Sequence, residues 1–141
     1  MVSSVPKKFQ ILNNALRCGL RVRLDAETPG YGNCWYYAIV QQMRRPEISC
    51  LIDVNIRYLN HYALRRKVSD YVETIHSTCP AILNYKNLYI ANHPTLTWEK
   101  YMREQSSNGS YADEIFIMAT AVLIGLDIHI TSEECTLLNP L

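Results

Sequence analysis

The chain has 141 residues, of which 48% are hydrophobic and 19% are charged. A chain of this length forms one domain that buries its own core without disulfides or metal ions. Lysine and arginine total 14 against 13 acidic residues, which gives a formal net charge of +1. This balance supplies no general attraction to nucleic acid or to an anionic membrane surface.

The cysteines and the apolar segments favour a reducing compartment inside the cell. Five cysteines lie at positions 18, 34, 50, 79 and 135, and no two of them form a C-x-x-C pair. This set argues against a disulfide framework and against a standard zinc module. The first ten residues lack the apolar stretch of a signal peptide, and the longest apolar run, Ile115 to Leu126, is too short to span a bilayer. We expect a cytoplasmic or nuclear protein with no metal and no cofactor.

The first half of the chain contains three predicted elements. A helix covers about Lys7 to Cys18 and ends at a glycine, and residues 21–24 alternate as a short strand or extended segment. From Cys34 to Met43 nearly every position is apolar, which predicts a helix buried on most of its faces. Pro46 ends this helix.

The middle of the chain is predicted to hold an amphipathic helix, in which apolar residues recur at three- and four-residue steps from Tyr58 to Ile75. We assign its basic run, Arg65 to Lys67, to the solvent-exposed side. Residues 81–93 lie between two prolines and are expected to be irregular or partly extended. The connector Ser49 to Asn55 and the segment Asn84 to Thr97 are candidates for substrate selectivity, because exposed irregular segments often carry it.

The last part of the chain is predicted to form a helix followed by a strand. A loop at 106–109 precedes Ser110 and Asp113, whose spacing resembles a capping box. A largely buried helix then extends from Ile115 to Ile124 and ends at a glycine. Leu126 to Thr131 alternates as a strand. No repeat or linker interrupts the sequence, so residues 1–141 are interpreted as a single domain.

Cys34 is the strongest candidate for a catalytic residue. It follows Gly30-Tyr31-Gly32-Asn33 and begins a predicted helix. The free N–H groups at a helix N-terminus favour a thiolate, and together with those of the glycine loop they can bind the oxyanion formed when a carbonyl is attacked. Asn33 can add a side-chain donor. The alternative is that Cys34 is a small buried hydrophobic residue.

The chain offers four histidines as a general base. His61 lies on the apolar side of its helix, His76 stands at a helix C-terminus where a cation is favoured, and His93 lies in a loop before a proline. His129 shares a strand face with Asp127, and a carboxylate that orients an imidazole is the arrangement a nucleophilic cysteine requires. We select His129 as the base. The alternatives are that it is a structural histidine or that the base lies beyond the end of this chain.

Two blocks of sequence carry a resemblance to a known family. The first is Leu24-Asp25 with Gly30 to Ala38, and the second is the series Trp98 to Met102, Gly109 to Ile115, Ala119 to Ala121 and Leu126 to Ile130. The first resembles the nucleophile motif of the ovarian-tumour (OTU) family of papain-like cysteine proteases, which cleave ubiquitin from proteins. The second is similar to that family's tryptophan helix, acidic-capped helix and core strand.

The resemblance implies a compact α+β fold, in which a small sheet packs between helices and the nucleophile lies at the N-terminus of a central helix. It also implies that Cys34 attacks the isopeptide carbonyl after the C-terminal glycine of ubiquitin and forms a thioester that water hydrolyses. The backbone from Tyr31 to Cys34, which includes Gly32 and Asn33, would supply the oxyanion donors. Trp35 would form a wall of the channel for the ubiquitin tail, or else pack in the core.

The chain departs from the family pattern at two places. Tyr31 stands where the family often has an aspartate, and no histidine–aromatic pair follows Thr131, where the family places its base. Two functions therefore stay open. The chain is a deubiquitinase acting on ubiquitin or a ubiquitin-like protein, or it is an OTU-like binding module that lacks a complete catalytic site or the family's C-terminal strands. A classical papain-type protease is excluded, because too few residues follow Cys34 to reach that family's histidine.

Overall fold

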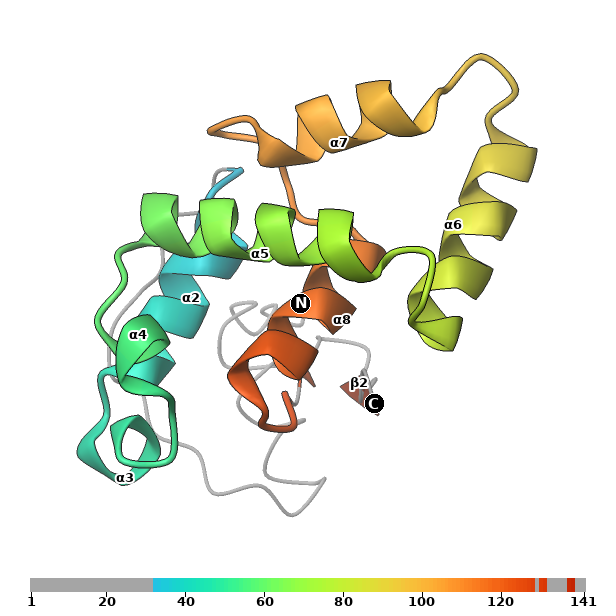
Figure 1. The fold of residues 1–141 in the computed structure, drawn as a ribbon. Helices are drawn as coiled ribbons and strands as arrows, with labels where there is room; N and C mark the ends of the chain where they lie inside the picture. Colours follow the sequence, from blue (N-terminus) through green and yellow to red (C-terminus); the bar gives the residue numbers. More distant parts are fainter. Residues whose placement is uncertain (1–31, 129, 132–136, 139–141) are drawn as a thin grey trace, which may run out of the picture. The chain divides into compact units, whose positions relative to one another are not determined.

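The computed structural model describes residues 32–128, 130–131 and 137–138, which belong to two compact units. One unit covers residues 28–126 and is helical where it is described, and the other combines residues 1–27 with 127–141. The helices of the first unit follow one another along the chain as α2 (Cys34–Met43), α3 (Pro46–Ser49), α4 (Val54–Arg57), α5 (His61–Ile75), α6 (Pro80–Asn92), α7 (Trp98–Ser106) and α8 (Glu114–Ile124) (Figure 1).

Helix α5 is the centre of the helical unit, because it packs against α2, α7 and α8, while α6 packs against α8 (Figure 1). Its apolar residues Leu64, Val68 and Val72 recur every fourth position and are fully buried. Tyr36 of α2 and Phe116 of α8 are fully buried as well. Each such side chain contributes about 1.5–3 kcal/mol when it leaves water, so this core fixes α2 and its first residue against α5 and α8.

Helix α2 has the bounds expected from its apolar run. Helix α5 starts later than predicted, at His61, because Asn60 caps it by accepting a hydrogen bond from the Ala63 amide at 2.9 Å. Tyr58, the predicted start, is instead the C-cap residue of α4 and is 72% exposed. The connector at 49–55 includes the end of α3 and the start of α4, so it is more regular than expected.

The prediction that residues 81–93 are irregular is wrong, because this segment lies almost wholly within helix α6. Pro80 occupies the first helical position, where its missing N–H is not needed and its fixed φ suits the helix. The segment Asn84 to Thr97 is therefore mostly helical, although Tyr85 and Leu88 are exposed.

The start of α8 also differs from the expected capping box. Asp113, not Ser110, is its N-cap, and the Asp113 carboxylate accepts hydrogen bonds from the amides of Ile115 and Phe116. Gly125 ends α8 as predicted, in the left-handed conformation with φ of 78°.

The small sheet of the expected α+β fold is represented, within the described ranges, by two short strands. These are β1 (Ile130–Thr131) and β2 (Leu137–Leu138), which pair antiparallel with Ile130 opposite Leu138. The predicted strand at 126–131 is observed at its last two residues, whereas 126–128 are not in a strand and 129 lies outside the described residues. The helix expected at 7–18 and the segment at 21–24 lie outside the described residues. Among the described helices, none is long and apolar enough to cross a membrane.

Candidate active site

Cys34 is the first residue of α2, as the sequence predicted, and it is a half-buried free thiol. Asn33 is the N-cap residue, and its carbonyl accepts the hydrogen bond from the Tyr37 amide at 3.1 Å. Its side chain makes no capping hydrogen bond to the helix. The first-turn amides beside Cys34 are thus not satisfied by this side chain, which is the arrangement that an oxyanion site needs.

The side chain of Asn33 points instead to a loop that is distant in sequence. Only 4% of Asn33 is exposed. Its Oδ1 accepts hydrogen bonds from Arg65 Nη2 at 2.8 Å and from the Gly109 amide at 2.9 Å. Its Nδ2 donates to Asn108 Oδ1 at 2.8 Å. These contacts give Asn33 an architectural role, and its predicted donation to the oxyanion stays a prediction.

Arg65 is the residue that the sequence analysis placed wrongly. It is 4% exposed, whereas Arg66 and Lys67 face solvent as expected. Its guanidinium donates to four oxygens. Two belong to the segment before α2, Gly32 O at 3.3 Å and Asn33 Oδ1 at 2.8 Å, one to the last turn of α7, Gln105 O at 2.7 Å, and one to the loop before α8, Ser110 O at 2.7 Å. Position 65 lies three residues before Val68, and residues with this spacing lie on the same face of a helix. This spacing is the signal in the sequence that Arg65 faces inward.

Burial sets the electrostatics of Arg65 and of the ring beside it. Loss of solvent lowers the pKa of Arg65, and Tyr36 opposes that change. Burial likewise raises the pKa of Tyr36, against the opposing effect of Arg65. The guanidinium stays charged and the phenol stays neutral at physiological pH. The Arg65 Cζ lies 4.3 Å from the centroid of the Tyr36 ring, within the range of a cation–π contact.

Gly32 is required because of its close approach to another backbone. A Cβ atom built on Gly32 would overlap the carbonyl group of Gly109. Gly109 itself has φ of 88°, in the left-handed region that favours glycine. The two glycines therefore allow the loop before Cys34 and the loop before α8 to touch. Tyr31, the remaining predicted member of the oxyanion loop, lies outside the described residues.

Trp35 connects α2 to α8. Its Nε1 donates to Thr120 Oγ1 at 3.2 Å, and the fully buried Thr120 hydroxyl donates to the Phe116 carbonyl at 2.6 Å. Trp35 itself is half-buried. This anchoring supports the core-packing interpretation of Trp35, and a second role as a channel wall stays a prediction.

The comparison with protein families decides the assignment. The model of the OTU-like cysteine protease family matches residues 29–139, which is most of the chain. The chain belongs to this family. A search of curated proteins gave no significant match. The matched region includes both Cys34 and the predicted base, His129.

The predicted base, His129, lies outside the described residues, so its role stays a prediction. Of the other histidines, His76 Nδ1 lies 2.8 Å from Lys86 Nζ, and its ring lies 4.8 Å from that of Trp98. His93 Nδ1 lies 2.8 Å from the carbonyl oxygen of Tyr89. Both rings are thus engaged within the α5–α7 part of the unit.

Among the described histidines, His61 packs against α2, the helix that begins at Cys34. Its ring stacks on Tyr37, with centroids 3.9 Å apart, and also contacts Tyr62. Its Nε2 is buried and has no hydrogen-bond partner among the described residues. Burial, and then the charge of Arg65, lower the pKa of His61. His61 is half-buried, on the apolar side of the helix where its sequence pattern placed it.

Proposed function

We propose that this OTU-like protease is a cysteine-dependent deubiquitinase, which cleaves the isopeptide bond after the C-terminal glycine of ubiquitin or of a ubiquitin-like protein. The observation that carries the proposal is the position of Cys34 at the first residue of α2, directly after a loop held by Arg65. The family assignment supports protease chemistry. A nucleophilic thiol needs a reducing environment, so we propose that the protein acts in the cytoplasm or nucleus.

The proposed reaction uses two covalent steps. The Cys34 thiolate attacks the carbonyl carbon, and backbone N–H groups around Cys34 bind the oxyanion of the tetrahedral intermediate. His129, oriented by Asp127, takes the proton of the Cys34 thiol and then gives it to the leaving lysine amine as the C–N bond breaks, so that a thioester to Cys34 remains. Water then attacks the thioester carbonyl carbon and gives one proton to His129. The C–S bond breaks, and His129 returns that proton to the Cys34 sulfur. The products are the free ubiquitin carboxylate and the restored thiol.

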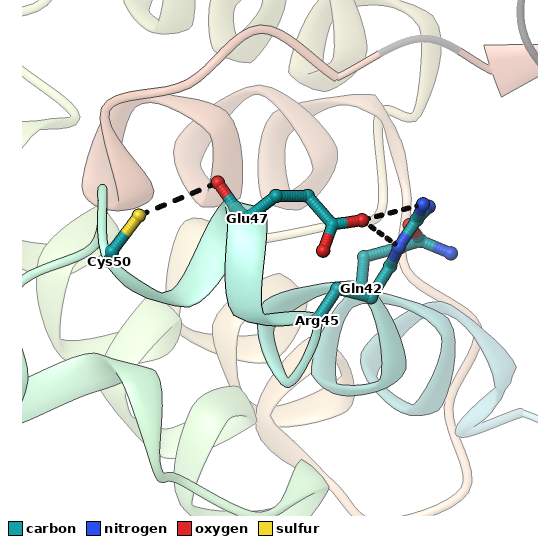
Figure 2. Close-up of polar contacts among 4 residues, drawn as sticks. All are labelled: Gln42, Arg45, Glu47 and Cys50. Atoms are coloured by element: carbon teal, nitrogen blue, oxygen red, sulfur yellow. Dashed lines mark hydrogen bonds and ion pairs between the residues drawn. The ribbon is translucent and has the colours of Figure 1, made fainter.

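The test is a reaction with ubiquitin that carries a C-terminal vinyl methyl ester. We expect one covalent adduct, mapped by mass spectrometry to Cys34, and no adduct with Cys34→Ala. Cys50 provides the matched control, because it is an exposed thiol whose Sγ lies 3.6 Å from the Glu47 carbonyl oxygen (Figure 2). Cys50→Ala should keep the adduct. An adduct on Cys50, or none with the parent chain, would contradict the proposal.

The second candidate is a binding module without turnover, which is favoured by the missing histidine–aromatic pair after Thr131. Such a module would bind ubiquitin but leave di-ubiquitin intact, and Cys34 would react with iodoacetamide no faster than Cys50. Parallel titration calorimetry and a di-ubiquitin cleavage assay separate the two functions.

A further inference from the structure

Two loops far apart in the sequence meet next to Cys34, and a single buried side chain joins them. The Arg65 guanidinium lies between the Gly32–Asn33 segment and the 105–110 segment, which comprises the end of α7 and the loop after it, and donates to oxygens on both sides. Asn33 makes two further hydrogen bonds to the second loop. We name these residues the Arg65 cluster, which consists of Arg65, Gly32, Asn33, Gln105, Asn108, Gly109 and Ser110.

The chemistry of this cluster requires arginine. Its four acceptors are three backbone carbonyl oxygens and one amide oxygen, so the buried charge is held by neutral groups. A guanidinium presents five N–H donors in a fixed planar fork, whereas a lysine ammonium presents three from one atom. Lysine therefore keeps the charge but cannot reach all of these acceptors in the same geometry.

The hydrogen bond to Gly32 affects the site through the peptide plane. The Gly32 carbonyl and the Asn33 N–H belong to one planar unit, and the chain has no cis peptide bond among its described residues. When Arg65 fixes the direction of the Gly32 oxygen, it also fixes the Asn33 N–H, which points the opposite way. That amide is one residue before Cys34, within the backbone proposed to bind the oxyanion.

We propose that Arg65 is a positioning residue for catalysis, which orients the backbone amides before Cys34 by holding them against the 105–110 segment. This inference rests on the proposed function. Because Arg65 is only 4% exposed, we expect it to act without touching the substrate. Its effect is therefore expected in the chemical step and not in substrate binding, because a displacement of about 1 Å in catalytic groups can cost about 100-fold in rate.

The experiment compares Arg65→Lys with Arg66→Lys, a control at the neighbouring exposed position. Cleavage of a fluorogenic ubiquitin amide is measured after thermal unfolding has established the folded fraction of each variant. For Arg65→Lys we expect kcat to fall about 10- to 100-fold with KM nearly unchanged. Arg66→Lys should match the parent chain. A loss of activity that follows only the unfolded fraction, or appears only in KM, would overturn the proposal.

Asn108→Ala keeps the proposal testable where Arg65→Lys fails to fold. Asn108 is exposed, and its removal frees Asn33 Nδ2. We expect a smaller fall in kcat in the same direction, and faster hydrogen exchange at the Gly109 amide, which donates to Asn33 Oδ1. Unchanged exchange and unchanged kcat would contradict the proposal.

The exchange measurement and the alkylation rate of Cys34 use no ubiquitin, so they separate the two hypotheses. If the parent chain does not react with ubiquitin, the proposed function fails. In that case, a changed Cys34 alkylation rate in both Arg65→Lys and Asn108→Ala, but not in Arg66→Lys, still supports the positioning role, and an unchanged rate overturns it.

Discussion

Gly32 is the residue at which a single methyl group should have the largest effect. In Gly32→Ala the new Cβ would overlap the Gly109 carbonyl, which is backbone and cannot rotate away as a side chain does. One of the two loops has to move, and strain of this kind costs about 1–3 kcal/mol. We expect a lower Tm and a loss of cleavage greater than the loss of folded protein, because the displaced loop leads directly into Cys34.

Gly109→Ala is the comparison for this effect. A Cβ at Gly109 meets no atom within 4 Å, so its cost comes from the left-handed φ alone. It should lower Tm while leaving the Gly32–Asn33 backbone closer to its original place, and cleavage per folded molecule should be higher than in Gly32→Ala. Equal Tm and equal activity of Gly32→Ala and the parent chain would show that the loops do not touch.

At the scale of the helix, the N-terminus of α8 depends on the half-buried carboxylate of Asp113. Burial raises the pKa of Asp113, and Glu114 adds to the rise, whereas hydrogen bonds from Tyr101, Phe116 and Ile115 oppose it. The folded state therefore holds this proton at pH values where the unfolded chain has lost it. The protonated Asp113 therefore stabilises the folded state fully below the ordinary pKa of 3.8. This contribution to the free energy of unfolding is lost as pH rises through the folded-state pKa.

Urea unfolding of the parent chain and of Asp113→Asn between pH 3 and pH 7 tests this expectation. Asparagine keeps an oxygen that accepts from the α8 amides but does not titrate. As pH rises, the free energy of unfolding of the parent chain should decrease relative to that of Asp113→Asn. A difference that is constant over this range would contradict the raised pKa of Asp113.

The helix ends that could be predicted are those marked by a local sequence signal. The bounds of α2 and the end of α8 follow from local signals, namely the apolar run before Pro46 and the left-handed Gly125. Helix α6 does not follow from the sequence pattern, because two prolines, Pro80 and Pro94, suggest the limits of an irregular segment, whereas Pro80 occupies the first helical position, where proline is favoured.

In the candidate site, too, the features set by local sequence could be predicted, and those set by long-range contacts could not. The place of Cys34 at a helix start is a local property, and the sequence predicted it correctly. The partners of Arg65 lie between 32 and 45 residues away along the chain, so only the tertiary structure brings them together. A basic run on a helix gives no sign of such partners, and charged residues are rarely buried. The contacts of Asn33 with Asn108 and Gly109 were unpredictable for the same reason.

At the scale of the whole chain, the proposed nucleophile and base belong to different compact units. Cys34 lies in the unit of residues 28–126, and residue 129 lies in the unit that includes 127–141, while the family match extends across both. The described core residues lie between Tyr36 and Ile124, all within the helical unit. Loss of the proposed base should therefore remove general acid–base catalysis and leave those core residues unchanged.

For His129→Ala we accordingly expect kcat to fall about 100-fold or more, since a positioned base contributes about that factor. The thermal unfolding of the helical unit should be unchanged. His93→Ala is the matched control, because His93 is an exposed histidine at the end of α6 and should keep full activity. Full activity of His129→Ala would assign the base to another group. A loss in both variants would instead point to a general effect of histidine removal on folding, which the unfolding curves would reveal.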